Sequence, residues 1–475
     1  MRSDIGPREG LPHGVATPSR SSPNGAVRTV DGRGGVEEKS IWRNREFLLL
    51  WLAQAISQTA QNAIWYGIVV LVQRQGHSST LLSLAILTLI IPSVIFGVLA
   101  GVYVDRWDKR TVLIGTNLIR GTIAFSYGLF GLPQALPLSL LFVINFLFST
   151  VGQFFAPAET AMIPTVVARQ KLLQANSLFH LTFTASQLGG LVVLGPLLAK
   201  VLGVEGLFVS MAAAIVICGA LVWPLPSSRG EHDPSVPASE REAIQGVWHD
   251  VQDIWHFVMR DRVVALAMVQ WTIGAILGLV VATLVPSFAE RLLNVAAENA
   301  VFVMAPAGIG MVAGTALLNR WGERLEKHFL VNVGLFTVAG CLALTGGLAF
   351  LAAWLTAGKV ELIEMPMLGQ VSAVVPPIMA LALVAGFGFV SIMVPAQTFL
   401  QERAPVELRG RVFAVQLMLS NFASIVPLLL LGGLADVIGV DKTLLLIGIL
   451  IAVAGVISVQ IAPGEAPFRR RHRSP

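Results

Sequence analysis

The chain has 475 residues, of which 55% are hydrophobic and only 13% are charged. Soluble domains are about 45–50% apolar on a similar count and about 25% charged, so a soluble fold is excluded. Two cysteines exclude a disulfide framework, and no Cys and His residues follow the spacing of a zinc site. The net charge of +5 comes from short basic groups between apolar stretches, which differs from the basic face of a nucleic-acid-binding domain. The composition predicts a polytopic membrane protein.

Residues 1–46 are rich in Gly, Pro, Ser and Arg without apolar periodicity, which predicts a disordered tail. A helix needs about 17–25 mainly apolar residues to cross the hydrocarbon core of a bilayer. Twelve such runs follow: 47–71, 82–104, 112–130, 138–155, 176–199, 207–223, 263–289, 301–318, 329–355, 378–394, 412–434 and 443–462. We therefore expect an all-α polytopic membrane protein with twelve transmembrane helices, followed by a basic tail at 463–475.

The distribution of Lys and Arg predicts the orientation of these spans. Of the 33 basic residues, 27 lie in the two tails and in every second loop, five lie in the alternate loops, and Arg120 alone lies within a span. Cytoplasmic segments carry the excess of Lys and Arg. We therefore expect both termini to be cytoplasmic and the protein to be a multi-pass protein of the plasma membrane.

The longest internal hydrophilic stretch, 224–262, separates six spans at 47–223 from six spans at 263–462. Its second part has apolar residues at helical spacing: Ile244, Val247, Val251, Ile254 and Val258. This pattern is typical of an amphipathic helix on the cytoplasmic membrane surface. A linker that ties two bundles together is favoured here over a regulatory site.

The two halves of the chain contain related motifs. Gly97 and Gly101 precede Asp105 after the second run, and Gly310 and Gly314 precede Asn319 after the eighth. Pro-Ala-Glu-Thr at 157–160 closes the fourth run, and Pro-Ala-Gln-Thr at 395–398 closes the tenth. Two copies in the same order indicate duplication of a six-helix unit, which is a transporter architecture.

The segment from Gly101 through Asp105 to Arg110 resembles the signature loop of the major facilitator superfamily. Residues 47–57, 154–158, 174–178 and 407–413 are similar to its efflux branch that includes the enterobactin exporter. The resemblance covers about residues 42–462. It implies two six-helix bundles, a central cavity lined by the first, fourth, seventh and tenth helices, and alternating access. This chain has Asn117 where that branch usually has an Asp three residues before the arginine of the third helix.

A carboxylate at the C-terminal end of a helix is unfavourable, because the helix dipole is already negative there. Asp105 stands in this position, and the resemblance brings it close to the start of the eleventh helix, so a charge pair could form only when the cytoplasmic side is closed. Gly97 and Gly101 would allow close approach of the helices. A topology signal is the simpler alternative. The candidate gating residues are Gly97, Gly101, Asp105, Arg106, Arg110, Arg120, Arg409 and Arg411.

Arg120 lies deep in the third run, where an arginine costs at least about 2.5–3.5 kcal/mol unless it faces protein or water. Asp105 and Glu159 are its candidate partners. A structural ion pair and extension towards the cytoplasmic interface are equally favoured alternatives, and a direct role towards substrate ranks third.

Amide and hydroxyl side chains recur at helical spacing and should face a cavity or another helix, because contact with lipid is costly. The family pattern favours the groups on the first, fourth and seventh helices as substrate-facing, while those on the fifth and eleventh hold helices together. Contacts between helices remain the alternative for all of them. The candidate substrate-binding residues are Gln54, Gln58, Gln61, Asn62, Asn145, Ser149, Gln153 and Gln270. The tenth run is nearly all apolar around Gly386 and Gly388, so one cavity wall should be polar and the other apolar.

None of the 28 acidic residues lies in the middle of a predicted span. Proton coupling would therefore run through Asp105, Glu159 or His180 near the cytoplasmic face. For His180, a hydrogen-bonded structural role is the favoured alternative. Cys218 and Cys341 are interpreted as apolar packing residues.

The sequence predicts a secondary-active exporter of small amphiphilic molecules, drug-like or siderophore-like, with proton antiport as the expected coupling. Uniport and a non-transporting receptor or scaffold are the alternatives. The sequence contains no phosphate-binding loop of an ATP-driven pump and no cluster of catalytic residues, so we expect no enzyme activity and no cofactor or metal. The expected partners are the lipid bilayer, a small-molecule substrate and protons, without nucleic acid, and the chain is expected to act as a monomer.

Overall fold

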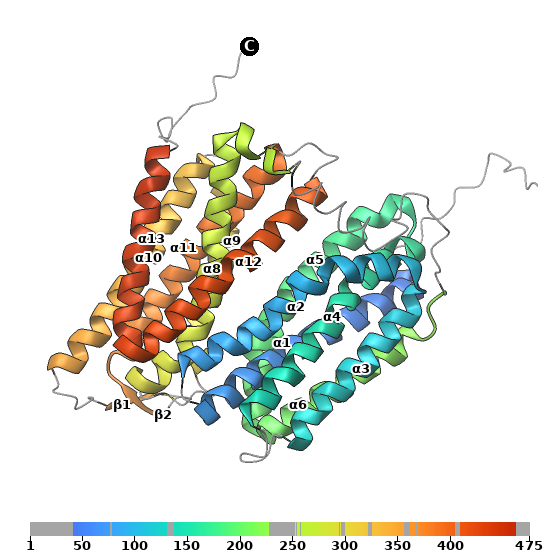
Figure 1. Ribbon diagram of the computed structural model, residues 1–475, viewed down its shortest axis with the longest axis horizontal. Coiled ribbons are helices and arrows are strands. Elements are labelled where there is room, and N and C mark those ends of the chain that lie inside the picture. Colours follow the sequence, from blue (N-terminus) through green and yellow to red (C-terminus); the bar gives the residue numbers. More distant parts are fainter. Residues whose placement is uncertain are drawn as a thin grey trace, which may run out of the picture. The chain divides into compact units, whose positions relative to one another are not determined.

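The computed structural model describes residues 41–461 apart from 77, 131–136, 228–251, 253, 257, 294, 296–299, 322–324, 356–361, 366–368 and 404–408. Long helices dominate this part of the chain (Figure 1), and their apolar composition follows the predicted runs. Within the described residues, twelve long helices stand where twelve spans were expected. The expectation of an all-α membrane fold is confirmed.

The N-terminal half contains η1 (Ile41–Arg43), α1 (Arg45–Gly76), α2 (Ser79–Arg106), α3 (Lys109–Phe130), α4 (Leu138–Val166), η2 (Arg169–Lys171), α5 (Leu172–Leu188), the π-helical η3 (Gly189–Leu194) and α6 (Gly195–Val222). The fifth and sixth predicted runs form one continuous segment, which kinks at Gly203. Gly203 has a φ of 77°, a left-handed conformation that glycine adopts without the steric cost of a side chain. The kink therefore provides the turn predicted between 199 and 207.

The C-terminal half contains α8 (Arg262–Leu293), α9 (Ala300–Trp321), α10 (Lys327–Leu355), the strands β1 (Leu362–Met365) and β2 (Gly369–Ser372), α11 (Val375–Arg403), α12 (Arg409–Ile438) and α13 (Val440–Ile461). The two strands pair antiparallel, with Ile363 opposite Val371. This hairpin was not expected from the sequence. Val371 is fully buried, so the hairpin is packed on the C-terminal half.

Eight stretches within the described residues are long and apolar enough to cross a membrane. One of them, Gln174–Val222, contains two of the expected spans. Helices α1, α3 and α9 are not among these stretches. The apolar part of α9, Val303–Leu318, is shorter. Helices α1 and α3 contain the polar side chains of Gln54, Gln58, Gln61 and Arg120. The polar residues in these helices are therefore the ones that need a structural explanation.

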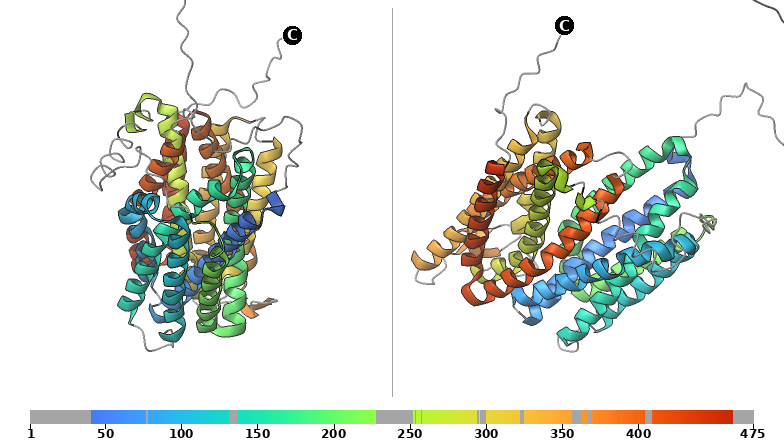
Figure 2. Two further views of the ribbon diagram at one scale, coloured as in Figure 1. Left: turned by 90° about the vertical axis from the view of Figure 1, so that its right-hand side faces the viewer. Right: turned by 45° about the horizontal axis from the view of Figure 1, so that its top comes forward.

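The apolar core divides between the two halves, except that Ile86, Leu87 and Ile90 of α2 pack into the core of the C-terminal half. In the N-terminal half α1 and α3 pack against α6, and α2 packs against α4; in the C-terminal half α9 packs against α11, and α10 packs against α11 and α13. The halves meet where α2 runs beside α12, with further contacts of α8 to α1 and α2 (Figures 1 and 2). The hydrogen bonds of Ser78 to Asp436 and of Ser83 to Leu428 place this contact at the end where α2 begins and α12 ends. We call it the α2-start end.

Two boundaries differ from the prediction. Ile41 and Asn44, assigned to the N-terminal tail, are part of the folded structure: Ile41 is buried, and the Asn44 side chain donates a 2.6 Å hydrogen bond to the Val166 carbonyl oxygen. Helix α4 continues to Val166, so Glu159 lies inside the helix rather than at its end. The apolar run stops at 155, but the backbone hydrogen bonding does not.

The predicted amphipathic segment is described only in part. Ile254 and Val258 are buried against the start of α8 and against Leu400 and Val412, which come from α11 and α12. Residues Ile244, Val247 and Val251 lie outside the described residues, as do 1–40 and 462–475 of the two tails.

Glycine brings α9 and α11 into direct backbone contact. A Cβ atom added to Gly386 would overlap the Ala307 carbonyl oxygen, and one added to Gly310 would overlap the Leu383 carbonyl oxygen. We expect Gly386→Val to lower the yield and the melting temperature of purified protein, since overpacking costs about 1–3 kcal/mol. Gly308→Val is the matched control, because a Cβ atom there meets no atom within 4 Å. Equal melting temperatures for the two variants would contradict this packing.

Candidate functional site

The N-terminal half contains a polar cavity of about 870 Å³. Pockets for small molecules are typically about 300–1,000 Å³. Amide, hydroxyl, charged and aromatic side chains from α1, α3, α4 and α5 line it: Gln54, Gln58, Gln61, Asn62, Trp65, Arg120, Phe148, Ser149, Gln153, Phe155, Glu159, Asn176, Phe179, Phe183 and Gln187. We call this space the N-half cavity.

Six of the eight predicted substrate-binding residues line the N-half cavity: Gln54, Gln58, Gln61, Asn62, Ser149 and Gln153. Gln54 donates a 3.3 Å hydrogen bond to the Phe179 carbonyl oxygen of α5, and Ser149 donates a 2.8 Å hydrogen bond to the Leu89 carbonyl oxygen of α2. These two residues therefore also connect helices. The Gln54 side-chain oxygen is buried without a hydrogen-bond partner.

The structure places Asn145 and Gln270 elsewhere, contrary to the prediction. Asn145 is fully buried and donates to the Ala85 carbonyl oxygen and to Thr88 Oγ1 of α2, at 3.0 and 2.7 Å. Gln270 is 1% exposed and donates a 2.8 Å hydrogen bond to Ser458 of α13. Both amides connect helices, which was the alternative interpretation for these polar residues.

Helix α5 lines the cavity as well, although it was expected only to hold helices together. Asn176 and Gln187 lie among the lining residues, and both belong to the polar series on the fifth predicted helix. The polar spacing on this helix was therefore visible in the sequence, but the family pattern assigned these residues to contacts between helices rather than to the cavity. Gln416 of α12 behaves as expected, since it donates a 2.9 Å hydrogen bond to Thr272 of α8.

Arg120 is 1% exposed and forms no salt bridge within 4.0 Å among the described residues. Its guanidinium donates to Gln61 at 2.5 Å and contacts Ser57 at 3.5 Å. It also lies 5.0 and 5.3 Å from the ring centroids of Phe148 and Phe155, within the range of cation–π attraction. The expected pairing with Asp105 or Glu159 is not found, so amide, hydroxyl and aromatic groups stabilise the charge instead.

Asn117 explains part of this arrangement. Its side-chain oxygen accepts a 3.3 Å hydrogen bond from Ser57, the same hydroxyl group that contacts Arg120. The residue that replaces the usual Asp thus belongs to the Arg120 network as a neutral group. Because Asn117 carries no charge, Arg120 and Glu159 are the charged groups among the lining residues of the N-half cavity.

Glu159 projects from α4 into the same cavity. Its Oε1 atom is buried without a hydrogen-bond partner. A carboxylate oxygen in this condition is available to a proton or to a polar group of a bound molecule. His180 lies on α5, but its side chain is outside the described part of the structure.

The candidate gating residues other than Arg120 lie towards the opposite end from the α2-start end. Asp105 is exposed, and its carbonyl oxygen accepts a 2.8 Å hydrogen bond from Lys109; Arg106 is exposed too. Arg110 lies 5.6 Å from the ring centroid of Trp223. Cβ atoms added to Gly97 or Gly101 would meet no atom within 4 Å, so the predicted close approach of α12 to these glycines is absent here. Arg409 and Arg411 are in the first turn of α12, and their side chains are not described.

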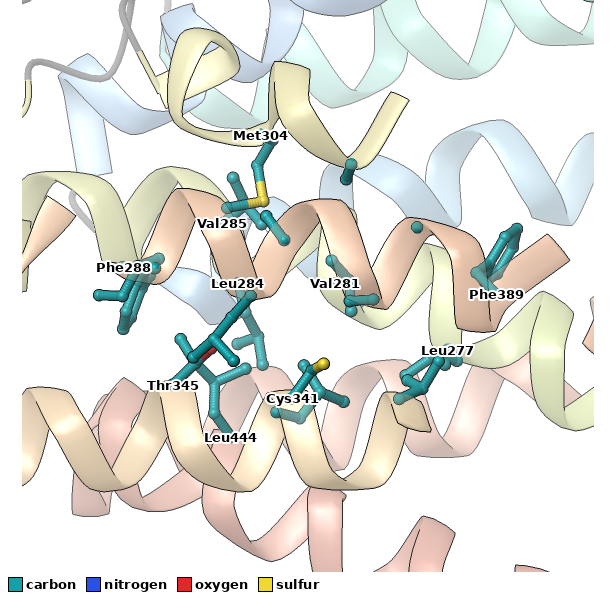
Figure 3. Close-up of a pocket in the computed structure, with 18 of the residues that line it drawn as sticks. Leu277, Val281, Leu284, Val285, Phe288, Met304, Cys341, Thr345, Phe389 and Leu444 are labelled. Atoms are coloured by element: carbon teal, nitrogen blue, oxygen red, sulfur yellow. The ribbon is translucent and has the colours of Figure 1, made fainter. Parts of the chain in front are cut away.

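The C-terminal half contains a smaller, apolar cavity of about 220 Å³ (Figure 3). Side chains from α8, α9, α10, α11 and α13 line it, among them Leu277, Phe288, Met304, Phe389 and Leu444. The Thr345 hydroxyl is the only oxygen-bearing side chain among the lining residues. The polar and apolar side chains thus line two pockets, one in each half, whereas the sequence predicted one central cavity with a polar and an apolar wall. Cys341 lines this cavity and Cys218 is fully buried, and both are free thiols.

The placement of the predicted residues can be checked by labelling. We expect cysteines introduced singly at Gln58 and Gln153 to react with a water-soluble thiol reagent in detergent-solubilised protein, because both positions line the N-half cavity. Cysteines at Asn145 and Gln270 should stay unreacted, because these positions are buried between helices. Cys218 and Cys341 are replaced by Ala beforehand, and mass spectrometry gives the labelled fraction. Fast labelling at Asn145 or Gln270 would contradict this assignment.

A bundle of membrane-length helices with a polar cavity in one half is the arrangement of a membrane transporter. The family model described as Major Facilitator Superfamily matches residues 50–427. The chain belongs to the Major Facilitator Superfamily, and it is therefore a multi-pass membrane transporter.

Several bacterial relatives match most of the chain. An uncharacterised transporter of this type, YfiS of Bacillus subtilis, is 25% identical over 89% of this chain and 94% of its own length. Macrolide efflux protein A of Streptococcus pyogenes is 23% identical over 90% of this chain and 98% of its own length. Multidrug efflux pump Tap of Mycobacterium tuberculosis is 23% identical over 82% of this chain and 86% of its own length.

Solved structures share the fold. The nucleoside transporter NupG aligns with a TM-score of 0.62 over 88% of this chain and 100% of its own length, at 12% identity. A bacterial homologue of the human lysosomal transporter Spinster aligns with a TM-score of 0.62 over 89% of this chain and 97% of its own length, at 13% identity. These similarities establish the transporter fold.

Proposed function

We propose that the protein exports small amphiphilic molecules across the plasma membrane by alternating access and is driven by protons. The observation that carries this proposal is the N-half cavity, which combines amide groups, aromatic rings and one unpaired buried carboxylate oxygen in a space of drug-molecule size. The relatives named for macrolide and multidrug efflux support the direction of transport. Their identities of 23% leave the substrate of this chain to experiment.

The lining of the N-half cavity fits an amphiphile. Trp65, Phe179 and Phe183 offer apolar faces, while Gln58 and Gln153 offer donors and acceptors within the same space. Small-molecule sites are mostly apolar with a few polar groups that fix the orientation of the ligand. The predicted substrate-binding residues Gln54, Gln61, Asn62 and Ser149 belong to this lining. Asn145 and Gln270 act indirectly in the proposal, through the positions of α4 and α8.

Glu159 is the proposed site of coupling to protons. A carboxylate inside a membrane helix changes charge when it binds a proton, and its environment changes when substrate occupies the cavity. Glu159 meets both conditions, because it lies within α4 and lines the cavity. His180 and Asp105 are secondary candidates on the same side of the N-terminal half.

In the proposed orientation both termini are cytoplasmic, so the α2-start end faces the outside. The contacts between the halves at that end then close the cavity to the outside. Export requires a second state in which these contacts open and the cytoplasmic ends of α2 and α12 meet. In that state Gly97 and Gly101 would receive α12, and Asp105 would meet the first turn of α12 with Arg409 and Arg411.

The test is flux in proteoliposomes that contain the purified protein. The probes are a radiolabelled macrolide antibiotic and a lipophilic dye cation, each measured with and without an imposed pH gradient. We expect the gradient to drive accumulation of at least one probe against its concentration difference. Flux that ignores the gradient would indicate uniport, and the absence of flux for both probes would refute export of these two compound classes.

A further inference from the structure

The C-terminal end of α12 carries an acid whose partners all belong to other helices. Asp436 lies at this end, and its carboxylate contacts the first turn of α2, which belongs to the other half of the chain. We propose that Asp436 is a positioning residue of the transport cycle: it latches α12 onto the start of α2 and keeps the cavity closed at the α2-start end. The description of this end as the outer one rests on the function proposed above, whereas the latch itself rests on the contacts.

The carboxylate accepts four hydrogen bonds from α2 and the residue before it. The backbone N–H groups of Ser79 and Thr80 donate at 2.9 Å each, and the hydroxyl groups of Ser78 and Thr80 donate at 2.6 and 2.7 Å. The first N–H groups of a helix have no acceptor within that helix. Ser78 caps α2 locally, because its hydroxyl oxygen accepts a 3.3 Å hydrogen bond from the Leu81 N–H group. Asp436 accepts from the N–H groups of Ser79 and Thr80, which precede Leu81.

The position of the charge makes the latch dependent on contact between the halves. A negative charge at the C-terminal end of its own helix is unfavourable, and a negative charge at the N-terminal end of another helix is favourable. Asp436 experiences both ends at once. Arg291 of α8 adds an ion pair at 3.2 Å. When the halves separate at this end, the carboxylate loses the start of α2 but keeps the unfavourable end of α12, so the contact stabilises the closed state selectively.

The surrounding residues allow and extend this contact. Gly432 lies one turn before Asp436, and a Cβ atom there would overlap the Ser83 hydroxyl group of α2. Ser83 donates a 2.9 Å hydrogen bond to the Leu428 carbonyl oxygen of α12. Beside this contact, Gln73 of α1 donates a 2.5 Å hydrogen bond to Glu290 of α8. The latch is thus part of a polar seam that joins four helices of the two halves.

The seam occupies one part of the α2–α12 pair. The described hydrogen bonds between these two helices involve Ser78 to Ser93 of α2, and none involves the later turns around Gly97 and Gly101. A permanent interface would be expected to continue along both helices. The contact covers the first half of α2 and ends near Ser93 and Val94, as expected of two halves that separate at one end when they close at the other.

The experiment measures the separation of the halves directly. Spin labels are attached to cysteines at Leu202 and Leu362, which are 52% and 45% exposed. Leu202 lies beside the Gly203 kink of the N-terminal half and Leu362 lies in β1 of the C-terminal half, so both positions are at the α2-start end. Cys218 and Cys341 are replaced by Ala, and electron–electron double resonance is recorded in lipid nanodiscs without substrate. We expect Asp436→Asn to raise the ratio of long to short distances by about tenfold, because the amide NH₂ group cannot accept the hydrogen bonds of a carboxylate. Asp436→Glu, which restores the carboxylate, should return the ratio towards the wild-type value.

Two further variants make the result specific. Asp441→Asn removes an acid five residues further on, in the first turn of α13, that takes no part in the latch, and it should leave the distances unchanged. Thr80→Val keeps the side-chain shape but removes one hydroxyl donor, so it should shift the ratio in the same direction by a smaller factor, and it serves as the test if Asp436→Asn does not fold. Wild-type distances in both Asp436→Asn and Thr80→Val would overturn the latch. Because no substrate is used, a failure of the flux experiment would refute the exporter proposal without deciding this one.

Discussion

Replacing Glu159 with Gln is expected to abolish accumulation driven by a pH gradient while leaving downhill flux measurable. The amide has nearly the same shape as the carboxylic acid but does not bind and release a proton in the physiological range. It can still form hydrogen bonds with a substrate in the N-half cavity. The loss should therefore fall on energy coupling rather than on passage through the protein, and the two are separated by measuring proteoliposome flux with and without the gradient.

Glu205→Gln is the matched control for this variant. Glu205 lies on α6, just after the Gly203 kink, and does not line the N-half cavity. Its replacement should leave uphill transport at the wild-type level. Unchanged uphill transport in Glu159→Gln would eliminate this coupling site. A Glu159→Gln, His180→Asn double variant that still accumulates substrate would leave Asp105 as the remaining candidate.

Replacing Arg120 is expected to lower transport at least about tenfold, since each hydrogen bond to a charged group contributes about 1.5–3 kcal/mol. Arg120→Met removes the donor to Gln61 and the cation beside Phe148 and Phe155, so these cavity-lining side chains lose what orients them. Arg120→Lys keeps the charge but not the planar group, and an intermediate effect is expected. The melting temperature should change less than the flux, because removal of a buried charge also removes its desolvation cost.

Flux per amount of protein in proteoliposomes and the melting temperature in detergent provide the two readouts. Arg320→Met, which removes an exposed arginine near the end of α9, is the control and should leave both unchanged. If Arg120→Met retained wild-type flux with a lowered melting temperature, Arg120 would be a structural residue only.

The sequence was sufficient to predict the helices, because a bilayer-spanning helix requires a long apolar run whatever it packs against. It did not reveal the full length of α4, since polar residues such as Glu159 and Thr160 continue the helix beyond the apolar run. Backbone hydrogen bonds, rather than hydropathy, set the end of a helix. An acid interpreted as terminal therefore proved to be internal.

The series on α4 shows why the site was predicted in part. Asn145, Ser149 and Gln153 recur every four residues, but a helix turns by about 100° per residue, so the series rotates by about 80° over its length. At its start Asn145 contacts α2, in its middle Ser149 both contacts α2 and lines the cavity, and at its end Gln153 lines the cavity. Spacing identifies the series, whereas only the packing identifies the neighbour of each member.

The latch at Asp436 could not be predicted from the sequence for a related reason. Ser78, Ser79 and Thr80 mark the start of a helix, and Asp436 marks the end of another, but 356–358 residues separate the partners. Two of the donors are backbone groups, which leave no mark on the identity of a residue. The expected gating residues around Asp105 lie at the other end of the same helix, where no described hydrogen bond joins α2 to α12.

Substitutions in the two copies of the glycine motif are expected to cause loss of function in two different ways. In the second copy Gly310 lies against the backbone of α11, so an inactivating substitution there would act on biogenesis, and the protein would be missing from the membrane. In the first copy a Cβ atom added to Gly97 or Gly101 would meet no atom within 4 Å in this state, so substitutions there would give a protein that is present in normal amounts but does not complete its cycle. Loss-of-function alleles at equivalent positions of the two repeats would thus be distinguished by an immunoblot before any transport is measured.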